Sequence, residues 1–132
     1  MSGTNPELTR AKSYFKGNTY GQLLSMAKKD APPLKDIVQA IEEFVKGEGR
    51  GITTSQLRNI FAKVKSEQDA NRLQLMRPVL AYTAARQGTQ GAKIIIALLD
   101  DLIQQVSDDN QLKSFKAFME SVVGYHKFHH PK

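Results

Sequence analysis

The chain has 132 residues, 40% of them hydrophobic, and carries a formal net charge of +6 with no cysteine. This composition fits one globular domain with a single hydrophobic core, and it excludes a disordered chain, disulfide bonds and thiolate metal sites. No apolar run approaches the roughly 18 residues that a membrane-spanning helix needs, and the N-terminus lacks the apolar core of a signal peptide. We therefore expect a soluble, cytoplasmic protein.

The first thirty residues show no clean hydrophobic period. Glycine, serine, threonine, asparagine and lysine mix there with scattered aromatic residues. A short helix is expected around residues 20–28 and ends at the Ala-Pro-Pro of residues 31–33, because the residue before a proline avoids helical geometry. We predict a flexible, poorly ordered N-terminal arm over residues 1–32, mobile or ordered by a partner, and a helical bundle domain over residues 33–132.

Two amphipathic helices are expected next. From Pro33 onward the apolar residues recur at helical spacing, and the glycine-rich residues 47–51 end this helix. Thr53, with Gln56 three residues later, predicts a capping box that opens the following helix. The apolar stripes of the two helices consist of Ile37, Ile41, Phe44 and Val45, and of Leu57, Ile60, Phe61 and Val64.

Three further helices are predicted in the second half of the chain. The first runs from about residue 69 to 87, and Pro78 inside it predicts a kink or a broken hydrogen bond just before that residue. The next follows the loop at residues 88–91. The isoleucine triplet at residues 94–96 suits a strand by itself, but the apolar period continues for more than a dozen residues, which favours a helix. A turn at residues 107–110 caps the start of the last of these three helices. The fold class is all-α, a bundle of about five helices.

The positive charge is concentrated in the middle third of the chain. Residues 50–93 contain eight basic and two acidic side chains, whereas residues 1–49 and 94–132 carry net charges of +1 and −1. A basic segment between near-neutral flanks is typical of a polyanion-binding surface, and a solvated charged face explains the charge about equally well. The candidate RNA-binding residues are Arg50, Arg58, Lys63, Lys65, Arg72, Arg77, Arg86 and Lys93.

The placement of these cations favours contacts with phosphates. Arg58 and Lys65 lie together on one edge of the apolar stripe of their helix, and Lys63 lies on the other. Phosphate contacts position a nucleic acid without reading its sequence. Aromatic side chains that would stack on bases are scarce here, because Phe61 and Tyr82 are both expected in the core. We therefore predict backbone binding and no base recognition.

The sequence offers little support for catalysis, a metal site or a nucleotide site. A nucleophile needs a base and an orienting group, and the only histidines are His126, His129 and His130, where we expect a frayed polar tail rather than a zinc or nickel site. The glycines of residues 47–51 lack the Lys-Ser/Thr of a Walker loop and the preceding strand of a dinucleotide-binding loop. We expect no enzymatic activity, no catalytic residue, no metal and no cofactor.

Three stretches of the chain resemble signatures of one protein family. Residues 52–61, ITTSQLRNIF, look like the TTSQ(I/L)RK(I/F) opening of the small-subunit family of type III-A CRISPR (Csm) effector complexes. Residues 75–86, LMRPVLAYTAAR, resemble its L.PKLAYAAGR-like helix, and residues 118–128, FMESVVGYHKF, are similar to its F..FFEAIVAYHKF close. Val79 and Ala85 depart from the lysine and the glycine that are common in the family, which affects one expected phosphate contact or the local packing.

The resemblance implies a helical bundle that stacks in several copies alongside a guide RNA–target RNA duplex. It also implies contacts with the repeated backbone subunit, which cleaves the target, and with the large subunit. Arg58 and Arg86 are then the best candidates for RNA contacts. The expected function is a non-catalytic structural subunit that holds guide and target RNA through sequence-independent phosphate contacts in antiviral defence.

The alternative is a stand-alone helical DNA-binding regulator. Such a protein needs an exposed recognition helix, and the helix that begins at Thr54 offers few base-reading side chains beyond Arg58 and Asn59. A preference for duplex DNA of defined sequence would favour this alternative.

Overall fold

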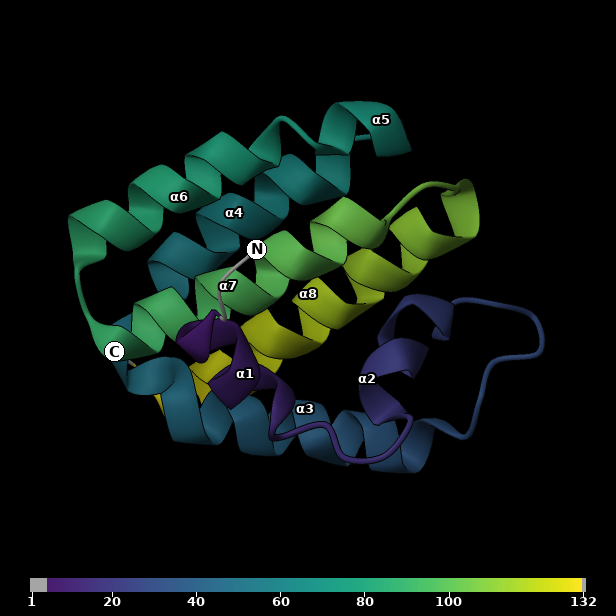
Figure 1. The fold of residues 1–132 in the computed structure, drawn as a ribbon, viewed down its shortest axis with the longest axis horizontal. Helices are drawn as coiled ribbons and strands as arrows, with labels where there is room; N and C mark the ends of the chain where they lie inside the picture. The colour runs from purple at the N-terminus through teal and green to yellow at the C-terminus, as the bar shows by residue number, and fades with distance from the viewer. Residues whose placement is uncertain (1–4, 132) are drawn as a thin grey trace.

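The computed structural model describes residues 5–131, and every regular element in this range is helical (Figure 1). The all-α fold class is confirmed, but the predicted count of about five helices is too low, because short helices near the N-terminus and a break before Pro78 add to it. In chain order the elements are α1 (Pro6–Lys12), α2 (Thr19–Gln22), the 3₁₀ segment η1 (Leu23–Ser25), α3 (Leu34–Glu48), the 3₁₀ segment η2 (Gly49–Gly51), α4 (Thr54–Ser66), α5 (Ala70–Leu73), α6 (Met76–Gln87), α7 (Gln90–Gln105) and α8 (Asp109–His129).

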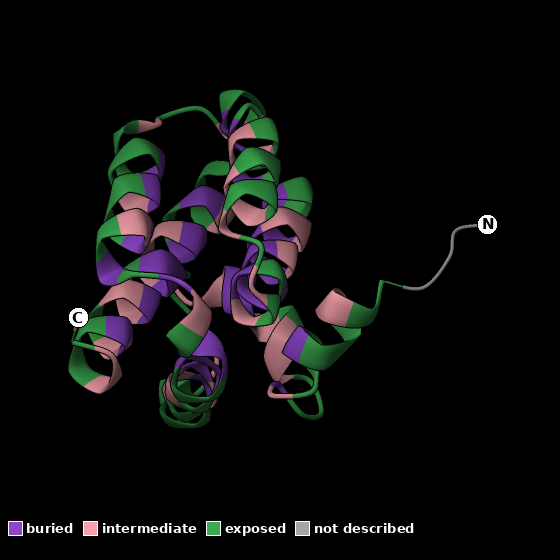
Figure 2. Cartoon of the chain, turned by 90° about the vertical axis from the view of Figure 1, so that its left-hand side faces the viewer, coloured by how far each residue is buried: buried purple, intermediate pink, exposed green. Residues whose placement is uncertain are grey.

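Helices α7 and α8 form the centre of the bundle. Helix α7 packs against α1 and α6, and α8 packs against α3, α4 and η1. Figure 1 shows α4 and α6 on one side of this central pair and α3 on the other. The buried faces turn inward in Figure 2. None of the helices described between residues 5 and 131 has the length and apolar character needed to cross a membrane.

The isoleucine triplet of α7 is helical, as the long apolar period predicts. Ile94, Ile95 and Ile96 are all buried, because α7 is covered by α1, α6 and α3. Successive residues of a helix point about 100° apart, so three adjacent side chains are buried together only when neighbours surround the helix. Burial of a large apolar side chain contributes roughly 1.5–3 kcal/mol, which outweighs the weak preference of isoleucine for strands.

Side-chain caps define the starts of three long helices. Thr53 Oγ1 accepts a hydrogen bond from the Gln56 backbone N–H at 3.0 Å, and the Gln56 side-chain oxygen accepts one from the Thr53 N–H at 3.0 Å. The predicted capping box of α4 is therefore confirmed. Thr89 and Asp108 cap α7 and α8 in the same way, each accepting from the backbone N–H three residues later. Caps of this kind are typically worth about 1 kcal/mol each.

The break before Pro78 divides the predicted helix at residues 69–87 into α5 and α6. Pro78 has no N–H to donate to the carbonyl of Gln74, and that carbonyl accepts instead from the Arg77 N–H at 3.1 Å. The broken helical hydrogen bond expected just before Pro78 is thus confirmed. The Gln74 side chain donates to the Ile103 carbonyl at 2.7 Å and ties the break to α7.

The described part of the N-terminal segment, residues 5–31, packs on the bundle in the structure, while the flexibility predicted for residues 1–32 stays a prediction. Helix α1 lies against α7, and η1 lies against α8. The buried Glu48 accepts hydrogen bonds from Tyr14 Oη at 2.6 Å and from Arg10 Nε at 2.9 Å. The core residues of this segment are Ala11, Phe15, Leu23 and Leu24.

The sequence could not reveal this packing because the helices are short. A helix of four to seven residues makes at most two turns, so its buried side chains do not repeat often enough to show a period. Residues 1–4 of the predicted arm lie outside the described residues. The boundary between residues 32 and 33 stays a prediction.

Candidate nucleic-acid interface

The exposed side of α4 carries three cations, and the helix contains no acidic residue. Leu57, Ile60 and Val64 turn into the core, so the intervening positions face water. Arg58, Lys63 and Lys65 are the exposed cations. Helix α4 therefore forms a positively charged ridge on this side of the bundle.

One groove lies between this ridge and α8. Arg58 and Lys65 line it together, as predicted from their shared edge of the helix. The small residues Ala62 and Gly124 also line it, and Glu120 of α8 is its one lining carboxylate. Neither cation is ion-paired with Glu120 in the structure.

A second groove lies on the other side of the ridge, between α4 and α6. Lys63 lines it from α4, and Arg86 lines it from the last turn of α6. None of the residues that line this groove is acidic. At one end, Gln56 Nε2 donates to Gln87 Oε1 at 2.7 Å and joins the two helices. Asn59 lines both grooves, so only the α4 ridge separates them.

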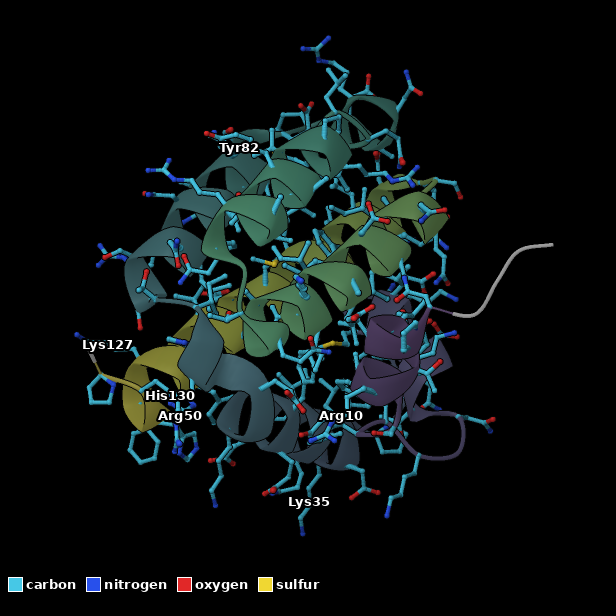
Figure 3. The ribbon with its side chains drawn as sticks, turned by 60° about the vertical axis from the view of Figure 1, so that its left-hand side comes forward. Arg10, Lys35, Arg50, Tyr82, Lys127 and His130 are labelled. Atoms are coloured by element: carbon cyan, nitrogen blue, oxygen red, sulfur yellow. The ribbon has the colours of Figure 1, made fainter. Side chains whose placement is uncertain are left out.

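Tyr82 also lines this second groove, and its side chain is 66% exposed. The prediction that Tyr82 belongs to the core was wrong. Helix α6 has apolar residues on every side, so its sequence does not show which side faces the core. In the structure Met76 and Leu80 are its buried residues. Figure 3 shows Tyr82 on the opposite side of the molecule from Lys35.

Four of the eight predicted residues thus come together around α4, and we call Arg58, Lys63, Lys65 and Arg86 the cationic surface. All four side chains are exposed. Among the described residues, none of them makes an ion pair. A set of cations without carboxylate partners keeps its full charge for an external anion.

Arg77 and Lys93 lie apart from the cationic surface. They share a groove formed by α6, α7 and the start of α1. Arg77 Nε lies 2.9 Å from Asp100 Oδ1, so a carboxylate already neutralises this arginine.

Arg50 and Arg72 line neither groove of the cationic surface. Arg50 follows α3 and shares a pocket with His130 at the end of the bundle, where Figure 3 shows the two side by side. Arg72 Nε lies 3.9 Å from Glu67 Oε2, a loose ion pair at the surface.

The three C-terminal histidines belong to α8 or follow it directly, so the predicted frayed tail was wrong. His126 is buried and its Nε2 donates to the Gly49 carbonyl at 2.7 Å, while His129 Nε2 lies 2.8 Å from Glu42 Oε2. Burial lowers the pKa of His126 below the ordinary value of a histidine. Within residues 5–131 no three His, Cys, Asp or Glu side chains are grouped to hold a metal ion.

A comparison with known protein families gives a match over most of the chain. The family model described as Csm2 Type III-A matches residues 28–132, which include helices α3 to α8 and the whole cationic surface. No curated protein and no solved structure matches the chain. Because the match covers well over half of the 132 residues, the predicted family is confirmed. The chain belongs to the Csm2 family, and it is a small subunit of a type III-A CRISPR–Csm complex.

Proposed function

We propose that this chain is a non-catalytic subunit that holds guide RNA and target RNA by their phosphates through the cationic surface. The observation that carries this proposal is the groove between α4 and α6, which contains Lys63 and Arg86 and no carboxylate. The groove between α4 and α8 adds Arg58 and Lys65. Membership in the Csm2 family supports the proposal, because the resemblance implies a complex built around guide RNA and target RNA.

The chemistry of these side chains suits phosphates better than base edges. Arginine presents a planar fork that binds two phosphate oxygens at once, and lysine acts as a point charge. Arg58 and Lys65 are seven residues apart, which separates their Cα atoms by about 10 Å along the helix axis. The surface therefore spans more than one phosphate, which a strand of RNA supplies in series.

The four other predicted cations have secondary roles in this proposal. Arg77 and Arg72 each have a carboxylate partner, so RNA would have to displace that partner before binding them. Arg50 and Lys93 make no ion pair among the described residues but lie outside the cationic surface. We expect these four to contribute less to RNA affinity than the cationic surface.

We also propose protein contacts with the backbone subunit, the large subunit and further copies of this chain. An apolar groove supports a protein-binding surface on the α3 and α8 side of the bundle. Tyr125 and Phe128 line it, and Phe128 is 74% exposed. None of the four residues of the cationic surface lines this groove, although Gly124 lines both it and the groove between α4 and α8, so the two surfaces adjoin.

The proposal is tested by the salt dependence of binding to fluorescein-labelled single-stranded RNA, measured by anisotropy. Each phosphate contact contributes about −0.7 to the slope of log K against log salt, so four contacts predict a slope of about −3. The double variant Arg58→Ala with Arg86→Ala should bind more weakly and flatten the slope by about 1.4.

The matched control removes two lysines from the other side of the bundle, Lys35→Ala with Lys46→Ala. Both residues are exposed on α3, so the net charge falls equally. The control should keep the affinity and slope of the wild type. Equal losses of RNA affinity in both double variants would show that net charge alone attracts RNA. A preference of the wild type for duplex DNA of defined sequence would favour the alternative function of a DNA-binding regulator.

A further inference from the structure

Tyr82 is the one exposed tyrosine among residues 5–131. The other three tyrosines are engaged: Tyr14 and Tyr20 donate hydrogen bonds to Glu48 and Asp101, and Tyr125 stacks on His129. Within residues 5–131, the Tyr82 hydroxyl has no hydrogen-bond partner and its ring pairs with no other aromatic ring.

Exposure alone does not identify a site, since single apolar side chains are common on protein surfaces. The surroundings of Tyr82 are the second observation. Arg86 lies four residues further along α6, on the same face as Tyr82, and Lys63 lines the groove from α4. The ring therefore shares a groove of about 420 Å³ with two cations and no acid.

The lining of this groove suits a nucleotide in other respects. Ile60 and Val79 are mostly covered and supply an apolar lining beneath the opening. Asn59 is a polar side chain on α4 within reach of a sugar or a base edge, whereas the Gln56 amide is already bonded to Thr53 and Gln87. An aromatic ring between phosphate-binding cations is the arrangement by which proteins hold single-stranded nucleic acid.

We propose that Tyr82 is a stacking platform for an unpaired base of the RNA, while Lys63 and Arg86 bind its flanking phosphates. This inference rests on the proposed function and adds a base contact to a surface otherwise limited to phosphates. Every base has an aromatic face, so the contact tolerates any sequence. It requires a base outside a duplex, because paired bases already stack on their neighbours.

Two other aromatic residues near the surface differ from Tyr82. The Phe61 ring is half-buried, and Lys65 Nζ lies over it at 5.9 Å from the centroid, so Lys65 would have to move before a base could cover that face. Phe128 is as exposed as Tyr82, but its groove contains the carboxylate of Glu42 and no cation. Phe128 is therefore the matched control for loss of an exposed ring.

The first test compares a base-bearing single-stranded RNA with an abasic strand of the same length. Tyr82→Ala should weaken binding of the base-bearing strand by about fivefold or more, the low end of measured stacking contributions, and leave the abasic strand unaffected. Tyr82→Phe should keep the affinity of the wild type, because the ring remains. Phe128→Ala should change neither affinity, and the salt slope should be the same in all variants.

A second test measures the contact between residue 82 and a base by fluorescence. The chain contains no tryptophan, so Tyr82→Trp places its one tryptophan in the groove, and excitation at wavelengths that tyrosine does not absorb selects it over the three remaining tyrosines. Base-bearing single-stranded RNA should quench its emission, whereas the abasic strand and duplex RNA should not. Equal quenching by the abasic strand, or unchanged affinity of Tyr82→Ala, would overturn the stacking role while the salt-dependent binding of the wild type stands. Absence of any RNA binding by the wild type would overturn both proposals.

Discussion

Thr54 and His126 meet at the junction of α4 and α8, where Thr54 Oγ1 lies 2.6 Å from His126 Nδ1. The other ring nitrogen donates to the Gly49 carbonyl, which can only accept, so Nδ1 of the neutral ring accepts from the threonine hydroxyl. One buried imidazole thus joins α8 to the start of α4 and to η2. Arg58 lies one turn beyond Thr54, so the same contact fixes the first cation of the cationic surface.

This contact predicts a loss of stability in acid. Burial, and then the neighbouring His130, lower the pKa of His126 in the folded chain, whereas an unfolded histidine has a pKa of about 6.5. As the pH falls below about 6.5, the unfolded chain takes up a proton at this residue and the folded chain does not, so the free energy of unfolding falls. The decline ends once the pH is below the folded-state pKa of His126. At about pH 8 both states are almost fully neutral at this residue, so it no longer makes the free energy of unfolding depend on pH.

Urea unfolding at several pH values between 5 and 8 measures the effect against His126→Gln. The variant should show a shallower decline below pH 6.5, the difference being at most about 1.4 kcal/mol per pH unit for one proton. Glutamine can still donate to the Gly49 carbonyl, so the variant keeps one of the two hydrogen bonds. Parallel pH profiles for wild type and variant would contradict the assignment.

Structural features that depend only on residues close together in the sequence were predictable. The capping box of Thr53 and Gln56, the break before Pro78 and the separation of Lys63 from Arg58 and Lys65 all follow from spacing along one helix. Spacing of three or four residues determines these contacts whatever surrounds the helix. Arg58, Lys63 and Lys65 lie close together for the same reason, whereas Arg86 joins them only because α6 packs beside α4.

Features that depend on distant parts of the chain were not predictable. His126 bonds to a carbonyl 77 positions earlier, and nothing near residue 126 indicates that partner. Tyr82 is exposed because α6 offers the core an apolar face in either orientation. The pairing of Arg77 with Asp100 likewise depends on how α6 and α7 cross.

Gly91 and Gly124 should respond in opposite directions to alanine. A Cβ atom on Gly91 would lie 2.5 Å from the Glu48 carbonyl oxygen and 3.3 Å from the Gly51 nitrogen, because α7 begins against the end of α3. Both contacts are with backbone, which cannot rotate away, so we expect Gly91→Ala to destabilise the fold by about 1–3 kcal/mol.

Gly124 lies within α8, and a Cβ atom there meets nothing within 4 Å. Gly124→Ala should raise the free energy of unfolding by up to about 1 kcal/mol, since alanine favours a helix and restricts the unfolded chain. Urea unfolding of both variants gives the comparison. A Gly91→Ala protein as stable as the wild type would show that α7 and the end of α3 do not approach this closely.

Arg77 and Arg86 should differ in RNA binding although both lie on α6. Asp100 neutralises Arg77, whereas Arg86 has no acidic partner among the described residues. Arg86→Gln should therefore flatten the salt slope of RNA binding by about 0.7, and Arg77→Gln should leave it nearly unchanged. The Arg77–Asp100 pair is partly exposed, so its loss should cost no more than about 1 kcal/mol of stability. A larger binding defect in Arg77→Gln would move the interface to the α6–α7 groove.

The buried carboxylate of Glu48 should control how firmly the N-terminal segment is held. It accepts hydrogen bonds from Tyr14 and Arg10, and it belongs to the last turn of α3, so these bonds attach the segment to the bundle. Glu48→Gln keeps the size of the side chain but removes the charge, which weakens both bonds. Because Arg10 is exposed, most of the expected loss of about 1–2 kcal/mol comes from the Tyr14 bond.

Amide hydrogen exchange locates that loss. Exchange should accelerate in α1 and in the residues up to Ser25, while the central amides of α8 keep their protection, because opening of the segment exposes only the residues that pack through it. Tyr14→Phe should accelerate the same amides, and the double variant should add little, since both changes act on the hydrogen bond between Tyr14 and Glu48. Uniform acceleration across α8 would show instead that Glu48 supports the whole bundle, and that the segment unfolds only together with it.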